Sequence, residues 1–275
     1  MRFPKTLTRT ARATWLAAAL SLAVTGCDVF DRLLAVKTPS RLAESAYLVP
    51  ANALLISNSA IADFECAHGA YIVASGLAAG EFVDGTQTAS RWDYDRRSVT
   101  ANQAHYATFG CAAVGVYTPL NTARYTNDQA VEMLEGWTDA QVANRNLLIA
   151  RNAAFAGWSL VLLGEGFCAC VIDVGPSLTP AQVFDSAEVR FDKAITAAQA
   201  AGDVTVERLA RVGRARARLN GGDLAGATAD AALVPDGFVF NGTADANAGS
   251  RNNRIYAQNN QGFSGKVASA YLGLT

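Results

Sequence analysis

The residue types that most often carry out catalysis are scarce in this sequence and form no known catalytic pattern. Only two histidines occur, His68 and His105, and each is expected to be a structural or surface residue and not a catalyst. The chain has no GxSxG elbow, no phosphate-binding P-loop and no HExxH zinc motif. The sequence therefore predicts no catalytic residue, no cofactor and no metal site, and a hydrolase is the least favoured function.

A polar segment between Asp84 and Gln103 carries the side chains best suited to hold a sugar. Aromatic faces stack on the C–H groups of pyranose rings, and Asp, Asn and Arg side chains bond to the hydroxyls. Trp92, Tyr94 and Arg96 lie together here and are the candidate ligand-binding residues. The alternative is that Trp92 anchors its own loop on neighbouring helices.

Residues 1–26 have the form of a secretory leader. Basic residues precede an apolar run from Trp15 to Val24, which is too short for a bilayer span of roughly 20 residues. The tetrapeptide Val24-Thr25-Gly26-Cys27 matches the lipobox of bacterial lipoproteins, in which the cysteine sulfur takes the lipid. We therefore expect cleavage after Gly26 and acylation of Cys27 with chains such as palmitate. Residues 27–38 then form a tether from a membrane anchor. Because Asp28 follows the lipidated cysteine, and Asp at this position holds lipoproteins in the inner membrane of some bacteria, the sequence does not fix the leaflet and side of the membrane.

Four further cysteines have at least three possible states. An oxidising envelope and an even count favour disulfides, with Cys168 and Cys170 each paired to Cys66 or Cys111. A direct bond between Cys168 and Cys170 would be strained, because one residue separates them. Free thiols are the second possibility. A metal site is the third, although zinc sites favour two or more residues between cysteine ligands.

Charge and composition exclude some classes of partner. Four of the 23 basic residues lie in the leader, so the mature part carries 19 basic against 24 acidic residues, a net charge of −5. Nucleic acids and anionic membrane surfaces need a basic face, so neither is an expected partner. Abundant alanine and few β-branched runs favour helices.

Apolar spacing and cap residues predict a chain of helices. We expect helix from about residue 40 to 75 with a break near Pro50, and again over 138–163, 180–200, 206–219 and 224–233. Capping-box patterns at Thr126, Thr138 and Thr179 are read as helix starts. Gly202, the Gly-Gly turn at 221–222 and Pro235 are read as helix ends, and Asp223 is read as the cap of the helix that starts at Leu224.

Three segments in this order resemble the SusD/RagB family of nutrient-uptake lipoproteins. They read ARNAAFAGWSLVLLGEGFCACVID at 150–173, LTPAQVFDSAEVRFDKAITAA at 178–198 and ARVGRARARLNGGDLAGATADAALVP at 210–235. Within the third, GDLAGA resembles the opening of the second helix of a tetratricopeptide-like unit. The resemblance covers most of residues 40–235.

The resemblance implies an all-α, tetratricopeptide-like domain over residues 39–275 that binds nutrients and is not an enzyme. Members hold oligosaccharides or peptides at the cell outer membrane, over a SusC-like TonB-dependent channel that imports them. Family chains are usually longer, so we expect this one to be truncated or a short relative. A tetratricopeptide-like scaffold for envelope assembly, binding no small ligand, is the alternative.

Overall fold

A computed structural model describes residues 47–85, 93–100, 115–245, 251–257, 265–271 and 273 of the protein. The chain divides into two compact units, residues 1–47 and 48–275. All described residues but Tyr47 belong to the second unit. The predicted leader and tether, with Cys27, lie outside the described residues.

The described residues are mainly helical, which confirms the all-α prediction at the level of fold class. The helices are α3 (Ala53–Ala79), α6 (Tyr117–Gly136), α7 (Arg145–Gly166), α8 (Pro180–Ala201), α9 (Val204–Gly221), α10 (Leu224–Ala231) and the short α11 (Arg254–Tyr256). Two 3-10 turns are η1 (Pro50–Asn52) and η3 (Ser269–Tyr271). Four short strands are β1 (Phe82–Asp84), β2 (Cys170–Val171), β3 (Ser177–Leu178) and β4 (Gly265–Val267).

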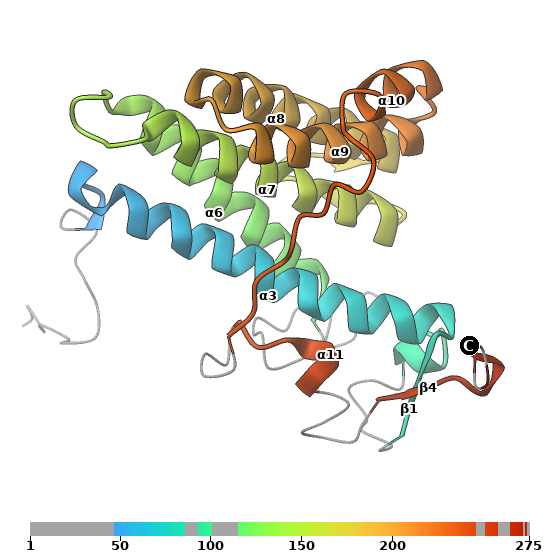
Figure 1. The fold of residues 1–275 in the computed structure, drawn as a ribbon. Helices are drawn as coiled ribbons and strands as arrows, with labels where there is room; N and C mark the ends of the chain where they lie inside the picture. Colours follow the sequence, from blue (N-terminus) through green and yellow to red (C-terminus); the bar gives the residue numbers. More distant parts are fainter. Residues whose placement is uncertain are drawn as a thin grey trace, which may run out of the picture. The chain divides into compact units, whose positions relative to one another are not determined.

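Successive helices pack against one another from α6 to α10, and α3 lies across α6 and α7 (Figure 1). The central helix is α7, which contacts α3, α6, α8 and α9. Among the described helices, α7 alone is long and apolar enough to cross a membrane, and 83% of its apolar window is buried inside the structure. Its apolar character is therefore accounted for by its place in the core.

Two phenylalanines of α8 pack onto glycines of α7. A Cβ on Gly157 would lie 2.8 Å from the Phe191 ring, and a Cβ on Gly164 would lie 2.5 Å from the Phe184 ring. The two glycines are seven residues apart, and so are the two phenylalanines, but the earlier glycine faces the later phenylalanine. The helices α7 and α8 are therefore antiparallel. The fully buried Phe191 ring also fills the space over Gly213 of α9. Glycine is needed here because any larger residue would push the helices apart.

Charged side chains join α8, α9 and α10. Asp230 of α10 is 2% exposed and accepts hydrogen bonds from Arg211, Arg214 and Arg218, which lie on one face of α9. The distances from these guanidinium groups to its oxygens run from 2.5 to 3.4 Å. Burial alone would raise the pKa of Asp230, but the hydrogen bond and charge of Arg214, with the other two charges, outweigh it and lower that pKa.

Buried amides attach α3 to its neighbours. Asn127 of α6 donates to the carbonyl oxygen of Ala60 at 2.7 Å, and Asn152 of α7 donates to the hydroxyl of Ser57 at 2.5 Å. Both asparagines and Ser57 are fully buried. A buried donor left without a partner costs about 1–3 kcal/mol, so these contacts restrict where α3 can lie.

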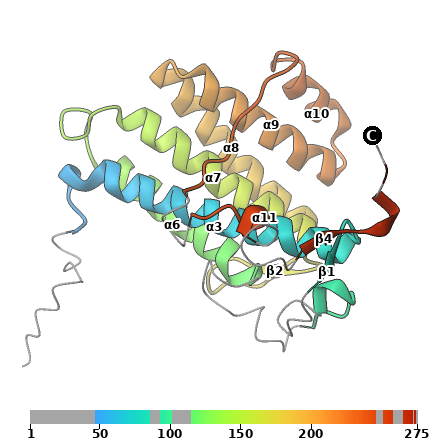
Figure 2. The same cartoon turned by 60° about the horizontal axis from the view of Figure 1, so that its bottom comes forward.

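After α10 the chain runs back across the helices towards α3, as both ribbon views show (Figures 1 and 2). We call residues 236–245 and 251–257 the return segment; α11 is part of it. Further on, β4 pairs antiparallel with β1, which follows α3, in the register Phe82 to Val267. Residues 265–267 thus lie beside the strand that follows α3, although about 180 positions of the sequence separate the two strands.

The helix caps predicted from the sequence agree with the structure at three positions and differ from it at two. Thr179 forms a full capping box with Gln182, Gly202 adopts the left-handed C-cap conformation, and Asp223 caps α10, all as predicted. Thr126 was read wrongly, because it lies inside α6, where its hydroxyl donates to the Thr122 carbonyl. The predicted helix start at Thr138 is also wrong: its backbone N–H does bond to the Gln141 side chain, but α7 begins only at Arg145.

Candidate functional site

The structure describes two of the three residues of the predicted sugar-binding cluster. Trp92 lies outside the described residues. Tyr94 is 7% exposed and belongs to the hydrophobic core, so it is not the exposed loop aromatic that the sequence suggested. Arg96 is exposed. Tyr94 is buried because its segment packs beside the end of α3, where apolar side chains cover the ring.

The cysteines also differ from the preferred pairing. Cys168 and Cys170 are both free, Cys168 exposed and Cys170 buried. Cys66 is in a disulfide whose partner lies outside the described residues, as does Cys111. Cys170 donates to the Leu163 carbonyl and sits in the core beside the turn after α7, which accounts for its being unpaired. No group of three or more His, Cys, Asp or Glu side chains in the described part of the chain is placed to hold a metal.

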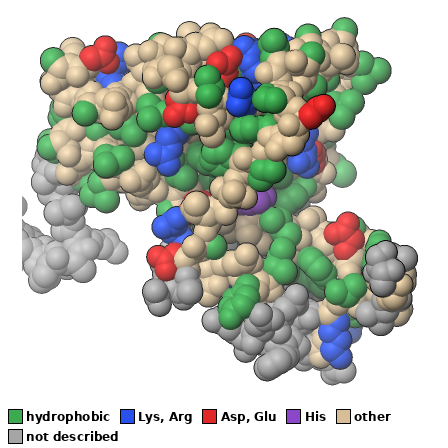
Figure 3. Space-filling model, in the orientation of Figure 1, with side chains coloured by type: hydrophobic (Ala, Val, Ile, Leu, Met, Phe, Trp, Pro, Cys, Tyr) green, Lys and Arg blue, Asp and Glu red, His purple; other side chains and the backbone are tan. Residues whose placement is uncertain are grey.

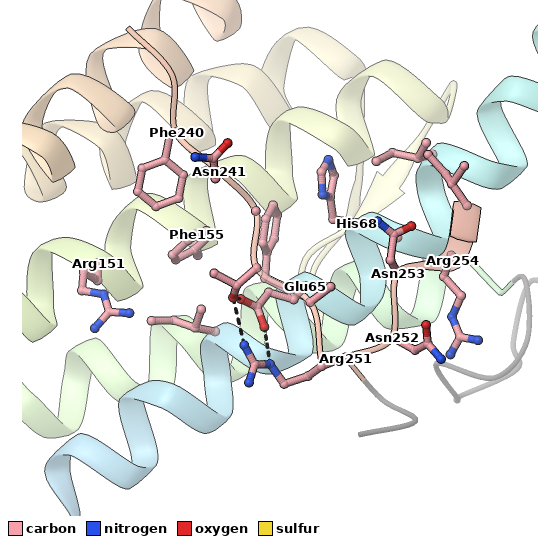
Figure 4. A pocket seen from close by; sticks show the side chains of 18 residues that line it. Glu65, His68, Arg151, Phe155, Phe240, Asn241, Arg251, Asn252, Asn253 and Arg254 are labelled. Carbon is pink, nitrogen blue, oxygen red and sulfur yellow. Dashed lines mark hydrogen bonds and ion pairs between the residues drawn. The ribbon is translucent and has the colours of Figure 1, made fainter. Parts of the chain in front are cut away.

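A pocket of about 300 Å³ lies between α3, α7 and the return segment (Figure 4). We call it the α3–α7 pocket. The residues that α3 contributes to its lining recur every three or four positions, so they lie on one face of that helix. The two residues that α7 contributes are one helical turn apart. Its described lining is Ile61, Phe64, Glu65, His68, Gly69, Ile72, Arg151, Phe155, Phe240–Ala244 and Arg251–Ile255. In the space-filling view a histidine side chain lies in a hollow of this face (Figure 3).

A three-residue cluster, which we call the clasp, fastens the return segment to α3. Arg251 Nε donates to Glu65 Oε2 at 2.5 Å, and Thr243 donates to the same carboxylate. Arg251 also donates to the Thr243 hydroxyl at 2.9 Å. The carboxylate of Glu65 is therefore occupied by partners 178 and 186 residues away along the chain, and the dashed lines in Figure 4 mark these contacts.

Aromatic rings make the apolar wall of the pocket. The Phe155 ring centroid lies 4.9 Å from that of Phe64 and 6.2 Å from that of Phe240, so one ring comes from each of the three elements. His68 stacks on Phe64 with 5.5 Å between centroids. Burial, followed by the charge of Arg216, lowers the pKa of His68. The imidazole is therefore neutral at pH 7 and offers one donor and one acceptor.

Polar side chains without internal partners also line the pocket. Among the residues that the structure describes, Arg151, Asn241 and Asn252 have side chains that make no hydrogen bond or ion pair. Arg254, which is 9% exposed, lies beside Gly69, whose missing side chain leaves space for it. Rings, amides and guanidinium groups that converge on one hollow are suited to binding a polar ligand without reacting with it.

A second, larger cavity of about 760 Å³ lies beside the C-terminal ends of α3 and α7. We call it the apolar cavity, because small and aromatic side chains make most of its wall. Its described lining is Tyr71, Ala74, Ser75, Ala78, Ala79, Tyr94, Arg97, Val99, Val116, Glu165–Ala169. Glu165 at its edge accepts hydrogen bonds from Nε and Nη2 of Arg216, each at 2.6 Å, and from Asn220, so its carboxylate faces α9.

Sequence reasoning missed the residues that make the α3–α7 pocket. Glu65 and His68 sit on a helix that reads as core, and Phe240 lies in a segment rich in Gly and Asn. Nothing in the spacing links residue 65 to residue 251. One available sign was Arg151, a charged residue two positions before the apolar run of residues 153–163.

Comparison with known proteins adds no assignment, because the chain matches no protein-family model, no curated protein and no solved structure.

Proposed function

We propose that the mature chain is a lipid-anchored binding protein of the SusD/RagB kind. It captures nutrient oligosaccharides or peptides at the outer membrane and passes them to a TonB-dependent channel. The mechanism is binding and transfer, without covalent chemistry. The lipobox at Cys27 supports the anchor, and the order of the segments at 150–173, 178–198 and 210–235 supports the family.

The arrangement of helices is compatible with this proposal. The pairs α8–α9 and α9–α10 pack as neighbours across short turns closed by Gly202 and Gly222, both in the left-handed conformation. Such stacked pairs are the repeating unit of tetratricopeptide-like scaffolds. The N-terminus of α10 lies at the GDLAGA sequence, where the resemblance expects the second helix of a unit to begin.

The observation that carries the proposal is the α3–α7 pocket. Three phenylalanine rings from three elements face a hollow that is also lined by the amides of Asn241 and Asn252 and the guanidinium of Arg151, which have no partner among the described residues. Binding pockets for small polar molecules combine apolar walls with a few polar groups that fix orientation. Phe240 is 38% exposed, so part of one ring is open to a ligand.

A pull-down of the lipidated protein from outer membranes tests the partner. We expect recovery of a large TonB-dependent channel, and we expect the Cys27→Ser protein, which cannot take the lipid, to leave the membrane fraction. Recovery of assembly factors alone would sink the uptake proposal.

Binding of oligosaccharide and peptide arrays to the purified protein tests the ligand. The Phe240→Ala variant should lose about fivefold or more in affinity, since stacking on an aromatic face contributes roughly 1 kcal/mol or more. A matched control is Leu233→Ala, which removes an exposed apolar side chain outside the pocket. An array with no hit, or equal loss in both variants, contradicts a binding role for the pocket.

A scaffold function is the second candidate, and one observation favours it. Leu219 and Leu224, on either side of the turn that joins α9 to α10, are 56% and 64% exposed. Exposed apolar side chains that gather at one end are typical of a protein contact. If the Leu219→Ser, Leu224→Ser double variant loses bound envelope proteins while ligand binding is unchanged, the scaffold role stands beside or in place of uptake.

A further inference from the structure

The charges around the α3–α7 pocket are unevenly distributed. Its described lining contains three arginines, Arg151, Arg251 and Arg254, but a single carboxylate, Glu65. That carboxylate is already bonded to Arg251 and Thr243. The pocket is thus basic in a mature chain whose net charge is −5. Stability does not require such a local reversal of charge, and a ligand of opposite sign would explain it.

Arg151 is the group that needs explaining. It is half-buried on α7, one helical turn before Phe155, and has no ion-pair partner among the described residues. Most other arginines in the described helices contact carboxylates, with Arg208 of α9 an exception; the paired ones include Arg124, Arg190, Arg211, Arg214, Arg216 and Arg218. Arg151 instead lies at the edge of the pocket beside the Phe155 ring (Figure 4).

The chemistry of guanidinium narrows the ligand. Its planar fork presents two parallel N–H donors, which match the two oxygens of a carboxylate. The neighbouring phenylalanine rings present flat apolar faces, and Asn241 and Asn252 present amides that both donate and accept. A sugar ring with a carboxylate substituent satisfies all three at once: C–H faces for the rings, hydroxyls for the amides and a carboxylate for Arg151.

We propose that the α3–α7 pocket takes an acidic oligosaccharide, whose uronic-acid carboxylate is bound by Arg151. This proposal rests on the proposed function, because it names the class of nutrient that the same pocket holds. It differs from that function in one respect: charge, in addition to shape, selects the ligand. Neutral sugars of the same linkage are then poor ligands.

The test uses an array of uronate-containing and neutral oligosaccharides matched in linkage. Titration calorimetry then compares the best acidic sugar with the same sugar after its carboxyl groups have been reduced to alcohols. We expect the reduced sugar to bind about tenfold or more weakly, because a charge-assisted, bidentate contact is lost. We also expect the affinity of the acidic sugar to fall as salt is raised.

Two variants separate the role of Arg151 from a general effect of charge. Arg151→Gln should bind the acidic sugar about tenfold more weakly and the reduced sugar with unchanged affinity. Arg208→Gln is the matched control: Arg208 is also half-buried, lies on α9 outside the pocket and has no ion pair among the described residues. This control should behave as the wild type with both sugars.

The outcomes distinguish the two proposals. If the acidic and reduced sugars bind equally, or if Arg151→Gln binds both as the wild type does, the charge-selection proposal is overturned and sugar binding stands. If no sugar binds in any form, both proposals fail for sugars. Binding of acidic peptides in place of sugars overturns the assignment to uronates while keeping the carboxylate contact.

Discussion

The two sides of α7 are held together in different ways. Towards α8, α9 and α10 the contacts join helices that are neighbours in the chain, through the Phe191 ring against glycines and the ion pairs of Asp230. Towards α3 and the return segment the contacts join residues 67 to 186 positions apart, through the amides of Asn127 and Asn152 and through the clasp. On the first side the contacts described are close packing and ion pairs between successive helices. On the second side they are hydrogen bonds between residues distant in the sequence.

This difference places the residues expected to matter most for stability and those of the proposed binding pocket on opposite sides of α7. The pocket lies on the α3 side, where Phe240 is partly exposed and Arg151 has no partner among the described residues. Sites that hold ligands are drawn from the less stable parts of a protein. The α8–α10 side can therefore provide the rigid frame, while the side that carries the return segment can adapt to a ligand.

The largest expected effect is from removing the Phe191 ring. Phe191→Ala leaves a cavity in a fully buried site between three helices, and we expect a loss of about 3–5 kcal/mol in the free energy of unfolding. Phe240→Ala, on the other side, should cost about 1 kcal/mol or less, because its ring is 38% exposed. Urea denaturation of both variants measures this. Similar losses would mean that the two sides are equally important for stability.

A smaller loss is expected from Asp230→Asn. The change removes one negative charge from among three arginines while it keeps the size of the side chain. The cost should be about 3 kcal/mol, since the guanidinium groups lose a buried partner. A matched control is Asp192→Asn, which removes an exposed partner of Arg214 and should cost well under 1 kcal/mol. Equal costs for the two variants would contradict the central place of Asp230.

Acid should weaken the same contact. The pKa of Asp230 is lowered in the folded protein, so its contribution is complete above the value of 3.8 for an unfolded aspartate and is lost as the pH falls through the folded pKa. The difference in unfolding free energy between the wild type and Asp230→Asn should therefore shrink below about pH 4. A difference that is unchanged at pH 3 would refute this account.

Opening the clasp should have a smaller and more local effect. Glu65→Gln removes the charge that holds Arg251, whose side chain is 35% exposed, so the cost should be about 1 kcal/mol. Hydrogen exchange should quicken in residues 236–245 and stay unchanged in α8 and α9. Faster exchange throughout would show that the return segment is part of the same cooperative unit as the stack.

The smallest expected effect is a difference in labelling rate between the two thiols that follow α7, Cys168 and Cys170; this prediction does not concern the free energy of unfolding. Cys168 is exposed, whereas burial raises the pKa of Cys170 to about 11. Because the thiolate is the reactive form, iodoacetamide at pH 8 should label Cys168 quickly and Cys170 slowly. Mass spectrometry of the intact protein counts the labels with time. Two labels at the same rate would contradict the buried position of Cys170.

The sequence predicted local features better than distant ones. The capping box at Thr179 and the end at Gly202 depend on a few adjacent residues, and both predictions are confirmed. The pattern at Thr126 failed because the same four residue types can also lie within a helix, where the hydroxyl bonds to a carbonyl one turn earlier. The pocket could not be predicted, because it depends on where the return segment crosses α3.

The length of chain between Glu65 and Arg251 has a consequence for how the protein is made. A chain that emerges N-terminus first presents α3 long before residues 243 and 251 arrive, and β1 likewise waits for β4. Contacts so distant in sequence form slowly, because closing a long loop is entropically costly. During this interval the apolar pocket face of α3 is uncovered and open to chaperones or to aggregation. The α3–α7 pocket is therefore among the last parts of the described structure to be completed.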